Sequence, residues 1–490
     1  MNPLPLFPPE VHIQTLCKKA RSSRQIASDK LADIERKSFA QLSHCFRKFI
    51  PEHLLQPSKS GVNSRRRVFS KETTFWAFLS QVLCADGGCK EVLAKQRAHA
   101  ALKGIKTPIS TGSYCKARLR FPEKDLAEIF EHSTSALDQR EQRDSLDKRR
   151  VIVVDGTGLT ASDSAKNRRA WPQQKQQKPG CGFPSLRVCA CFSLKTGGVL
   201  SYKIGNKKSH ELRLFRKQRK FLRAGDILLG DKMFCNYFEL ASLKNIQVDS
   251  AVTLPANKSK PIKGCNALDI LGENDLLIKW KRPVRAKKAA YSLTQWRKLP
   301  EELMLRQIKV TVNTPGFRVK SFYIITTLLD PLEYPAADLA ELYFRRWEVE
   351  LNFDDLKTTM GMDHLRCKTP SMVRKELMMY FIAYNAVRWL IYESSEQHGA
   401  NPLEVSFKGA IQSVRQWEPY FKQPKWTKTE RQIITEKLYL SVVQNTVLYR
   451  PNRREPRCLK RRPKPYQLLT AHRSKMKEIP HRSKYRAKVA

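Results

Sequence analysis

The sequence predicts an α/β fold, in which a sheet-containing centre stands between an all-helical N-terminal region and a basic C-terminal tail. Two short, continuous apolar runs, at residues 151–154 and 227–230, are typical of strands that are covered on both faces. Segments with helical periodicity follow them, in the β–α–β order expected of a parallel sheet. Between residues 256 and 320 the pattern changes to short alternating stretches, which predict antiparallel ribbons.

Each of the two apolar runs ends in an aspartate, Asp155 after the first and Asp231 after the second. Functional groups gather at the carboxyl ends of strands in parallel α/β sheets. We therefore expect Asp155 and Asp231 to lie at one edge of the sheet. Asp226 begins the second run, so it is expected at the opposite edge and is the weaker candidate for a functional site.

A third carboxylate comes from residues 341–360, which contain neither Gly nor Pro and suit a helix of roughly five turns. Four side chains recur there at spacings of 3, 4 and 7, within an arc of roughly 60° on an ideal helix: Tyr343, Arg346, Glu350 and Lys357. A solvated helix with ion pairs such as Arg346–Glu350 would show the same pattern. The two strand-end aspartates favour a functional face, because three carboxylates in one place suit Mg²⁺ or Mn²⁺.

These four residues form the pattern Tyr-x-x-Arg-x-x-x-Glu-x-x-x-x-x-x-Lys, which resembles the signature of bacterial DDE transposases of the insertion-sequence-four family. Val-Val-Asp-Gly-Thr at 153–157 and Gly-Asp-Ile-Leu-Leu-Gly-Asp-Lys at 225–232 resemble the two Asp motifs of that family. The segments 365–370, 455–457 and 460–465 resemble further family stretches. The resemblance covers most of the chain and is weakest before about residue 70.

The resemblance implies a ribonuclease-H-like catalytic core that is interrupted by a β-rich insertion. We predict an N-terminal helical, DNA-binding domain at residues 1–147 and the catalytic domain at residues 148–395, with its insertion at 256–320. Residues 396–490 are predicted to form a helical C-terminal region with the basic tail. The implied function is cut-and-paste DNA transposition. Such an enzyme binds the terminal inverted repeats of its own mobile element, cleaves the ends by metal-dependent phosphodiester hydrolysis and joins the 3′ ends to target DNA.

The implied active site holds two Mg²⁺ or Mn²⁺ ions, as phosphodiester cleavage by two metals requires. Asp155 would bridge both ions, while Asp231 and Glu350 would each complete one coordination sphere. Asp354 follows Glu350 by one helical turn and is the rival third ligand on the same face. Only the register of the family signature favours Glu350 over Asp354.

The resemblance also implies that Tyr343, Arg346 and Lys357 hold phosphates and the terminal nucleotides of the element. Arg346 suits a bidentate phosphate contact and Lys357 a point charge. After the second aspartate the family often has Arg, whereas this chain has Lys232. A lysine keeps the charge but lacks the planar fork of arginine, so a phosphate contact by Lys232 would be weaker.

The composition points to a polyanionic partner. The 490 residues include 91 Lys and Arg against 46 Asp and Glu, a formal net charge of +45. Without a membrane segment, such an excess favours nucleic acid over lipid. Residues 450–490 contain 15 Lys and Arg but only 2 acidic residues, which predicts a disordered basic tail that contacts phosphates. The most apolar helix candidate, residues 377–392, is too short to span a bilayer.

The expected partner is double-stranded DNA, both the terminal inverted repeats and the target, and the resemblance implies a homodimer in a synaptic complex of two DNA ends. No membrane partner is expected. The 12 Cys residues lack metal-finger spacing and are expected to be reduced. The N-terminus lacks the features of a signal peptide. We therefore expect a soluble, cytoplasmic bacterial protein that associates with the nucleoid.

The resemblance implies that the β-rich insertion contacts the element end. Its two tryptophans, Trp280 and Trp296, are candidates to stack on an unpaired base, as aromatic residues do in proteins that bind single strands. Core packing is the more common role for either residue.

Two segments outside the motifs leave alternatives open. Ser70 is a plausible N-cap for an apolar helix, and the basic segment 114–120 could complete a helix-turn-helix-like reader of DNA ends. An all-helical lid explains the same periodicity. Residues 171–180 suggest a mobile basic loop, which either contacts DNA or is simply flexible.

Two other functions compete with transposition. A structure-selective nuclease on the same fold would cut without strand transfer, but it would need neither the inserted ribbon nor the basic tail. A non-catalytic, basic nucleic-acid-binding protein would explain the charge, but would leave Asp155 and Asp231 as coincidences at strand ends.

Overall fold

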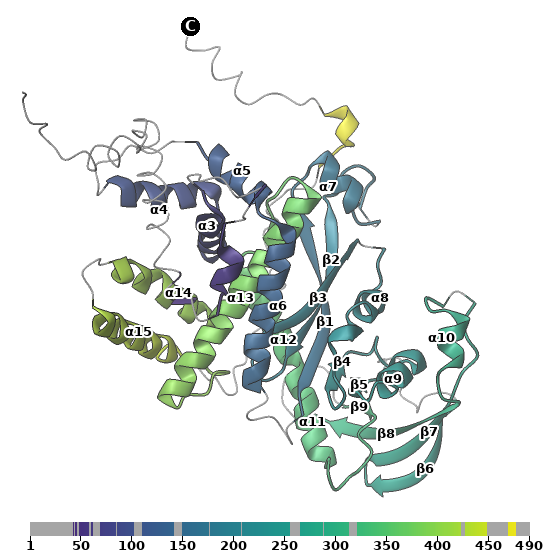
Figure 1. Ribbon diagram of the computed structural model, residues 1–490. Coiled ribbons are helices and arrows are strands. Elements are labelled where there is room, and N and C mark those ends of the chain that lie inside the picture. The colour runs from purple at the N-terminus through teal and green to yellow at the C-terminus, as the bar shows by residue number, and fades with distance from the viewer. Residues whose placement is uncertain are drawn as a thin grey trace, which may run out of the picture. The chain divides into compact units, whose positions relative to one another are not determined.

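The protein is described from a computed structural model, which covers fifteen stretches of the chain (Figure 1). The described residues are 43, 45–46, 49–57, 60–61, 69–84, 86–101, 110–141, 149–175, 177–206, 208–254, 265–287, 289–312, 321–422, 427–447 and 469–476. Most of the predicted basic tail, with the segments 455–457 and 460–465, lies outside them. Contacts divide the chain into two compact units, residues 1–47 with 52–122 and residues 48–51 with 123–490.

The first unit is helical in its described residues. Its elements are a short 3-10 helix (Glu52–Leu55), α3 (Lys71–Leu83), α4 (Cys89–Ala101) and α5 (Gly112–Arg120). The predicted N-cap is confirmed, because the Ser70 side chain accepts a hydrogen bond from the backbone N–H of Thr73. The hydroxyl of the buried Tyr114 on α5 donates to Gln81 Oε1 on α3 at 2.7 Å. The helix-turn-helix-like role of this unit stays a prediction.

The second unit is built on a mixed, ten-stranded sheet, with the order β3-β2-β1-β4-β5-β9-β8-β7-β6 and β10 paired to the far end of β1. The strands are β1 (Val151–Ala161), β2 (Ser185–Ser193), β3 (Val199–Asn206), β4 (Ile227–Gly230), β5 (Asp249–Thr253), β6 (Cys265–Gly272), β7 (Asp275–Lys281), β8 (Glu302–Thr311), β9 (Ser321–Thr326) and β10 (His364–Leu365). Both predicted apolar strands are therefore confirmed.

The register of β1 and β4 fixes the position of the two strand-end aspartates. These strands run parallel, with Val151 opposite Ile227 and Val153 opposite Leu229. Asp155 and Asp231 each follow the second of these pairs by two residues, so they lie level with each other where β4 ends, while β1 itself continues to Ala161. On either side the pattern differs, because β3, β2 and β1 are antiparallel, whereas β5 continues parallel to β4.

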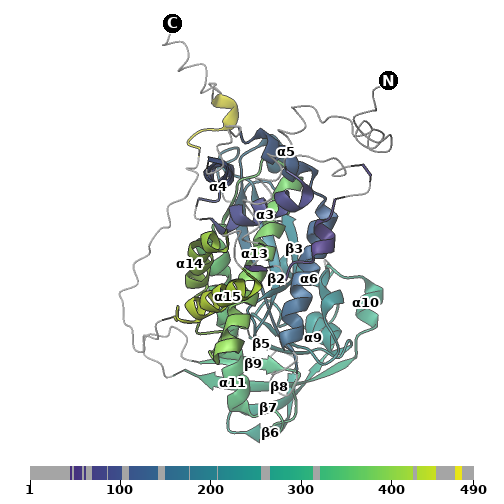
Figure 2. The ribbon, with the colours of Figure 1, turned by 60° about the vertical axis from the view of Figure 1, so that its left-hand side comes forward.

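Helices cover both faces of the sheet (Figure 1). α6 (Glu123–Glu141) and α13 (Pro370–His398) pack on one face, and α8 (Glu211–Arg216) and α9 (Tyr237–Lys244) pack on the other. α14 (Phe407–Trp417) and α15 (Lys428–Val443) lie against α13 (Figure 2). The predicted domain boundaries after residues 147 and 395 differ from the division into two compact units. α6 belongs to the second unit and packs on β3, and α13 packs on α14 and α15.

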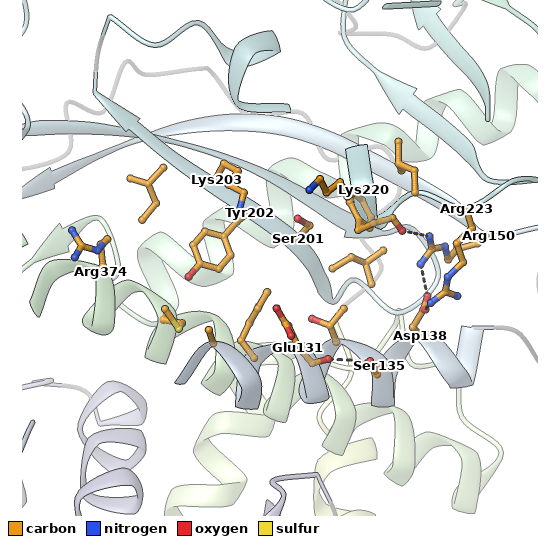
Figure 3. A pocket seen from close by; sticks show the side chains of 18 of the residues that line it. Glu131, Ser135, Asp138, Arg150, Ser201, Tyr202, Lys203, Lys220, Arg223 and Arg374 are labelled. Carbon is orange, nitrogen blue, oxygen red and sulfur yellow. Dashed lines mark hydrogen bonds and ion pairs between the residues drawn. The ribbon is translucent and has the colours of Figure 1, made fainter. Parts of the chain in front are cut away.

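A cavity of about 760 Å³ lies between α6, the edge strand β3 and residues 219–223 (Figure 3). Basic and acidic side chains both line it, and several of them pair with each other. Arg374 donates to Glu123 at 2.7 Å, and Arg150 donates to Asp138 at 2.9 Å. Part of the charge on this wall is therefore paired, although the lining has five basic side chains against three acidic ones.

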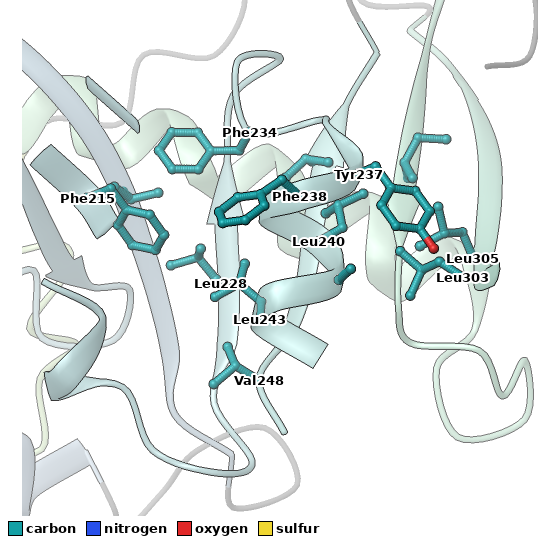
Figure 4. Packing of buried hydrophobic residues seen from close by; sticks show 14 of the residues in the cluster. Phe215, Leu228, Phe234, Tyr237, Phe238, Leu240, Leu243, Val248, Leu303 and Leu305 are labelled. Atoms are coloured by element: carbon teal, nitrogen blue, oxygen red, sulfur yellow. The ribbon is translucent and has the colours of Figure 1, made fainter. Parts of the chain in front are cut away.

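The main core lies on the α8 and α9 face of the sheet (Figure 4). Ile152 and Val154 of β1 point into it, together with Phe215 of α8 and Leu240 of α9. Alternate residues of β1 face the other side, where Phe192, the partner of Val153 in β2, packs edge-to-face on a phenylalanine of α12, the helix described below. Asp155 follows Val153 in this alternation, whereas Gly156 follows Val154.

The predicted antiparallel ribbon is confirmed, but it does not form a separate layer. β8 pairs with β9 from Arg306–Thr326 to Thr311–Ser321, and β9 pairs with β5. The insertion therefore continues the central sheet beyond β5. A short helix, α10 (Leu293–Arg297), lies between β7 and β8 in the chain.

The predicted single helix at residues 341–360 is wrong in detail. The segment begins earlier and consists of four pieces: α11 (Ala336–Phe344), a 3-10 turn (Arg345–Trp347), α12 (Glu348–Asp354) and a π-helix (Asp355–Thr359). The 3-10 turn has about three residues per turn and the π-helix more than 3.6, so side chains drift from their ideal positions. Arg346 and Glu350 nevertheless both lie within electrostatic range of Asp155.

The remaining described elements are short: α7 (Ala165–Ala170) and 3-10 turns at Arg219–Phe221, Glu418–Lys422 and Arg473–Lys475. The segment at 171–180 has no regular structure but is not a free loop. The Gln173 side chain donates to the carbonyls of Gln177 and Lys178, and Arg473 donates to the carbonyl of Gly180. In the described part of the chain, none of the helices combines the length and the apolar character needed to cross a membrane.

Candidate active site

Asp155 is the centre of the acidic edge. It is the fifth residue of β1, and its Oδ1 accepts a hydrogen bond of 2.8 Å from the backbone N–H of Gly156. Burial raises the pKa of the Asp155 carboxyl to about 6, against the effects of this hydrogen bond and of the Arg346 guanidinium. The carboxylates of Asp231 and Glu350 raise it further. The three predicted carboxylates therefore lie within electrostatic range of one another.

Asp231 follows β4 directly and is half-buried. Its Oδ1 accepts a hydrogen bond of 2.8 Å from the backbone N–H of Met233, which holds the carboxyl at the end of the strand. Asp226, at the start of the same strand, is buried and accepts two hydrogen bonds from Arg150, at 3.0 and 2.7 Å. This confirms that Asp226 belongs to the opposite edge of the sheet.

Glu350 lies on α12 and is exposed. Its rival Asp354 accepts a hydrogen bond of 2.7 Å from the Thr358 hydroxyl, and its charge raises the pKa of Asp355. Glu350, by contrast, is among the charges that raise the pKa of Asp155. The electrostatics therefore support Glu350 as the third member of the site.

Arg346 brings a positive charge to the same edge. It is only 8% exposed and lies over the rings of Tyr343 and Trp347, with its Cζ atom 5.7 and 5.5 Å from the ring centroids. Its Nε atom is buried and has no hydrogen-bond partner among the described residues. A guanidinium that faces Asp155 with an unused donor suits an anionic ligand.

Tyr343 is placed differently from the prediction. It is 1% exposed, and its hydroxyl donates to the carbonyl of Gly230 at 3.0 Å and lies 3.3 Å from Thr253 Oγ1. A side chain so enclosed does not reach a phosphate as it lies. Its contact with Gly230 instead supports the backbone immediately before Asp231.

The two predicted phosphate-binding lysines, Lys357 and Lys232, lie at the periphery of the site. Lys357 is half-buried in the π-helix, and its Nζ atom forms an ion pair with Asp363 Oδ1 at 3.3 Å. Lys232 is exposed next to Asp231. Both positions are compatible with phosphate contacts, which stay predictions.

The two tryptophans of the insertion are buried, at 9% exposed for Trp280 and 7% for Trp296. Trp280 packs edge-to-face on Tyr237, with ring centroids 5.4 Å apart. Trp296 stacks on Tyr291 at 5.3 Å. The structure therefore supports the alternative of core packing, and both rings also line a cavity of about 300 Å³.

A further carboxylate, Glu211, lies at this edge and was not identified from the sequence. It is the first residue of α8, and its carboxylate lies so close to Gly156 that a Cβ atom there would stand 2.4 Å from Oε2. Burial raises the pKa of Glu211 to about 7, helped by Asp155 and Asp231 and opposed by Arg187. No spacing in the sequence predicts that Glu211 lies close to Gly156, because this contact depends on the position at which the chain leaves the β2–β3 hairpin and begins α8.

The donor set at this edge suits magnesium or manganese. Its ligands are carboxylate oxygens, which hard divalent cations prefer. Within the described ranges, no three such side chains converge closely enough to hold an ion as they stand. Burial and like charge raise the pKa values of two of the carboxyls. Divalent cations would relieve that repulsion.

The 760 Å³ cavity (Figure 3) is not part of this edge. It is lined by Arg150 and Asp138, which lie at the amino end of β1. The acidic edge, with Asp155 and Asp231, lies further along β1, where β4 ends.

Comparisons with known proteins bear on the family of this chain. The family model described as "Transposase DDE domain" matches residues 146–386, which include Asp155, Asp231 and Glu350. The chain is 23% identical over 357 residues to "Transposase InsG for insertion sequence element IS4" from Escherichia coli (strain K12), covering 71% of this chain and 76% of that protein.

Two solved structures show weaker similarity. The piggyBac transposase synaptic complex with hairpin DNA is 10% identical with a TM-score of 0.40, covering 85% of this chain and 86% of that one. The Mos1 transposase paired-end complex with the left transposon end is 15% identical with a TM-score of 0.15, covering 35% and 56%. We draw no argument from either. The family model and the curated relative support membership of the DDE-type insertion-sequence transposases.

Proposed function

We propose that the protein carries out cut-and-paste transposition, by cleaving the ends of its own mobile element and joining the 3′ ends to target DNA. The observation that supports this proposal is that Asp231 and Glu350 both lie within electrostatic range of Asp155, beside the paired strands β1 and β4. Parallel pairing of β1 and β4 brings the two aspartates together, and α12 adds the glutamate.

The sheet topology supports a ribonuclease-H-like core. Three antiparallel strands, β3, β2 and β1, are followed by β4 and β5 parallel to β1. The third carboxylate then comes from a helix after the last core strand. This order matches the core that the sequence resemblance implies.

Asp155, Asp231 and Glu350 would hold two Mg²⁺ or Mn²⁺ ions. When bound, such ions lower the pKa of an attacking water or 3′-hydroxyl and stabilise the leaving oxygen. The chain's own backbone holds the carboxyls in place, through the N–H groups of Gly156 and Met233. No His or Ser nucleophile is needed.

DNA phosphates would be held by basic side chains around this edge. Arg346 has a buried, unused Nε donor beside Asp155, and Lys232 is exposed next to Asp231. Lys357 would join them by exchanging its ion pair with Asp363 for a phosphate. The terminal inverted repeats and the target are the proposed DNA partners, in a synaptic complex of two subunits, and the net charge of +45 supports a nucleic-acid partner.

The test is a cleavage assay on the element's terminal repeat with Mg²⁺ or Mn²⁺, comparing the wild type with Asp155→Ala and Glu350→Ala. We expect metal-dependent nicking at the repeat boundary, followed by joining to target DNA, and neither with the two variants. Nicking without joining would favour a structure-selective nuclease. Binding without any nicking would favour a non-catalytic nucleic-acid-binding protein.

A further inference from the structure

Glu211 reaches the acidic edge from the face of the sheet opposite to Glu350. α8 packs on the face to which Ile152 and Val154 point, and Gly156 continues that alternation. α12 packs on the other face, where its Phe353 meets Phe192. Asp155 is therefore flanked by one carboxylate from each side of β1.

Gly156 provides the space for this approach. A Cβ atom at Gly156 would lie 2.4, 2.5 and 2.9 Å from Oε2, Cδ and Oε1 of Glu211. These separations are shorter than van der Waals contact, and all three atoms belong to the one carboxyl group. The absence of a side chain at position 156 is thus what lets the Glu211 carboxylate stand beside Asp155.

Glu211 also lacks the partners that a structural carboxylate has. Glu239, on the neighbouring α9, is 0% exposed and forms ion pairs with Arg216 and Arg219. In the part of the chain that the structure describes, neither an ion pair nor a hydrogen bond joins the Glu211 carboxylate to another residue. Two arginines close to Glu211 in sequence are thus committed to Glu239, which leaves Glu211 facing other carboxylates.

We infer that Glu211 is a fourth carboxylate of the divalent-metal site, which contributes an oxygen from the α8 side of β1 while Glu350 contributes one from the α12 side. This inference rests on the proposed function. A half-buried carboxylate that faces two aspartates, with Arg187 as the only positive charge that acts on it among the described residues, is disfavoured until a cation joins them. Glu211 therefore binds the cation directly or through a water molecule.

The first test measures Mn²⁺ binding to the full chain by electron paramagnetic resonance, without DNA. Glu211→Gln keeps the shape of the side chain and removes its charge. We expect it to weaken Mn²⁺ binding by about 10-fold or more, the effect typical of losing a supporting group at a metal site. Glu131→Gln, a matched change of an exposed carboxylate on α6, should leave the affinity unchanged. Equal affinities of Glu211→Gln and the wild type would overturn the inference.

The second test uses Gly156→Ala, which changes no charge. The added methyl group should displace the Glu211 carboxylate and weaken Mn²⁺ binding. In a Glu211→Ala background, the three atoms nearest to the methyl group are gone, so Gly156→Ala should have little further effect. An equal loss in both backgrounds would show that Gly156 acts through Asp155, and that Glu211 plays no part. Thermal unfolding of each variant shows whether it is folded.

Asp155→Asn distinguishes a failure of the inference about Glu211 from a failure of the proposed function. If Asp155→Asn abolishes Mn²⁺ binding and nicking while Glu211→Gln changes neither, the inference about Glu211 fails and the proposed function stands. If the wild type neither binds Mn²⁺ nor nicks the terminal repeat, the proposed function fails, and the inference fails with it.

Discussion

The two ends of β1 and β4 are built from the same residue types but differ in charge balance. At the amino end, Arg150 donates to both Asp138 and Asp226, and Arg223 pairs with Asp138. Two aspartates there meet two arginines. At the carboxyl end, four carboxylates face one buried arginine, Arg346. Balanced buried charge is what a stable fold requires, whereas an uncompensated cluster is retained for binding or catalysis.

The largest expected effect is on catalysis at the carboxyl end. Asp231→Ala removes a proposed metal ligand but no phosphate contact. We expect the variant to bind element ends with nearly wild-type affinity and to give no detectable cleavage, as measured by gel shift and nicking assays on the same DNA. Cutting at the wild-type rate would remove Asp231 from the site and leave the two ends of the strands functionally alike.

At the amino end the expected effect is on stability. Arg150→Ala leaves two buried aspartates without their shared partner, and breaking a buried ion pair in this way costs about 3–5 kcal/mol. The free energy of unfolding in urea measures this loss. A buried charge is tolerated only while its partner is present. A loss of less than about 1 kcal/mol in the free energy of unfolding would therefore contradict the pairing of Arg150 with Asp138 and Asp226.

Replacing Asp155 by Asn should increase, rather than decrease, the free energy of unfolding of the metal-free protein. Its pKa is about 6 when folded and near 3.8 when exposed, so the folded state holds its proton more tightly. The stability from this group is present below about pH 4 and is lost as the pH rises through about 6. Asp155→Asn should therefore raise the free energy of unfolding at pH 8 by up to about 3 kcal/mol, with little gain at pH 4.

Metal addition provides the matched control for that experiment. Mg²⁺ or Mn²⁺ at pH 8 should raise the melting temperature of the wild type but not of Asp155→Asn, since only the wild type has the full set of carboxylates to bind the ion. A wild type that melts at the same temperature with and without these ions would show that the carboxyl end is not a cation site.

The smallest expected effect concerns DNA affinity. Lys232→Ala removes one exposed positive charge next to Asp231. Binding should weaken similarly for all DNA sequences, and the slope of log affinity against log salt should fall by about 1. Lys124→Ala, on the exposed side of α6, should leave the slope unchanged. If both variants change the slope equally, the charge of the chain acts diffusely rather than at the carboxyl end.

The sequence allowed the central features to be predicted because they depend on local pattern. Continuous apolar runs located β1 and β4, and the β–α–β order of the following segments predicted the parallel part of the sheet. Glu350 was assigned by the signature register, and the observed electrostatics support it. In these cases, residues close in sequence determine which face or edge a side chain occupies.

What the sequence did not reveal depends on tertiary contacts. The break of the signature helix accompanies the burial of Tyr343, whose hydroxyl reaches Gly230 across more than a hundred residues of chain. Glu211 meets Gly156 only because the β2–β3 hairpin folds back and α8 begins where it does. Trp280 and Trp296 are indistinguishable by composition from base-stacking residues until the aromatic neighbours that bury them are known.

The continuity of the sheet has a mechanical consequence. From β4 to β6 the path crosses five hydrogen-bonded ladders, through β5, β9, β8 and β7. At the usual strand spacing of about 4.8 Å, this corresponds to about 24 Å. Backbone hydrogen bonds fix every step, so a ligand held on the outermost strand stands at a set distance from Asp231. Lengthening the β6–β7 hairpin would extend its reach along the strands, yet would leave that lateral spacing unchanged.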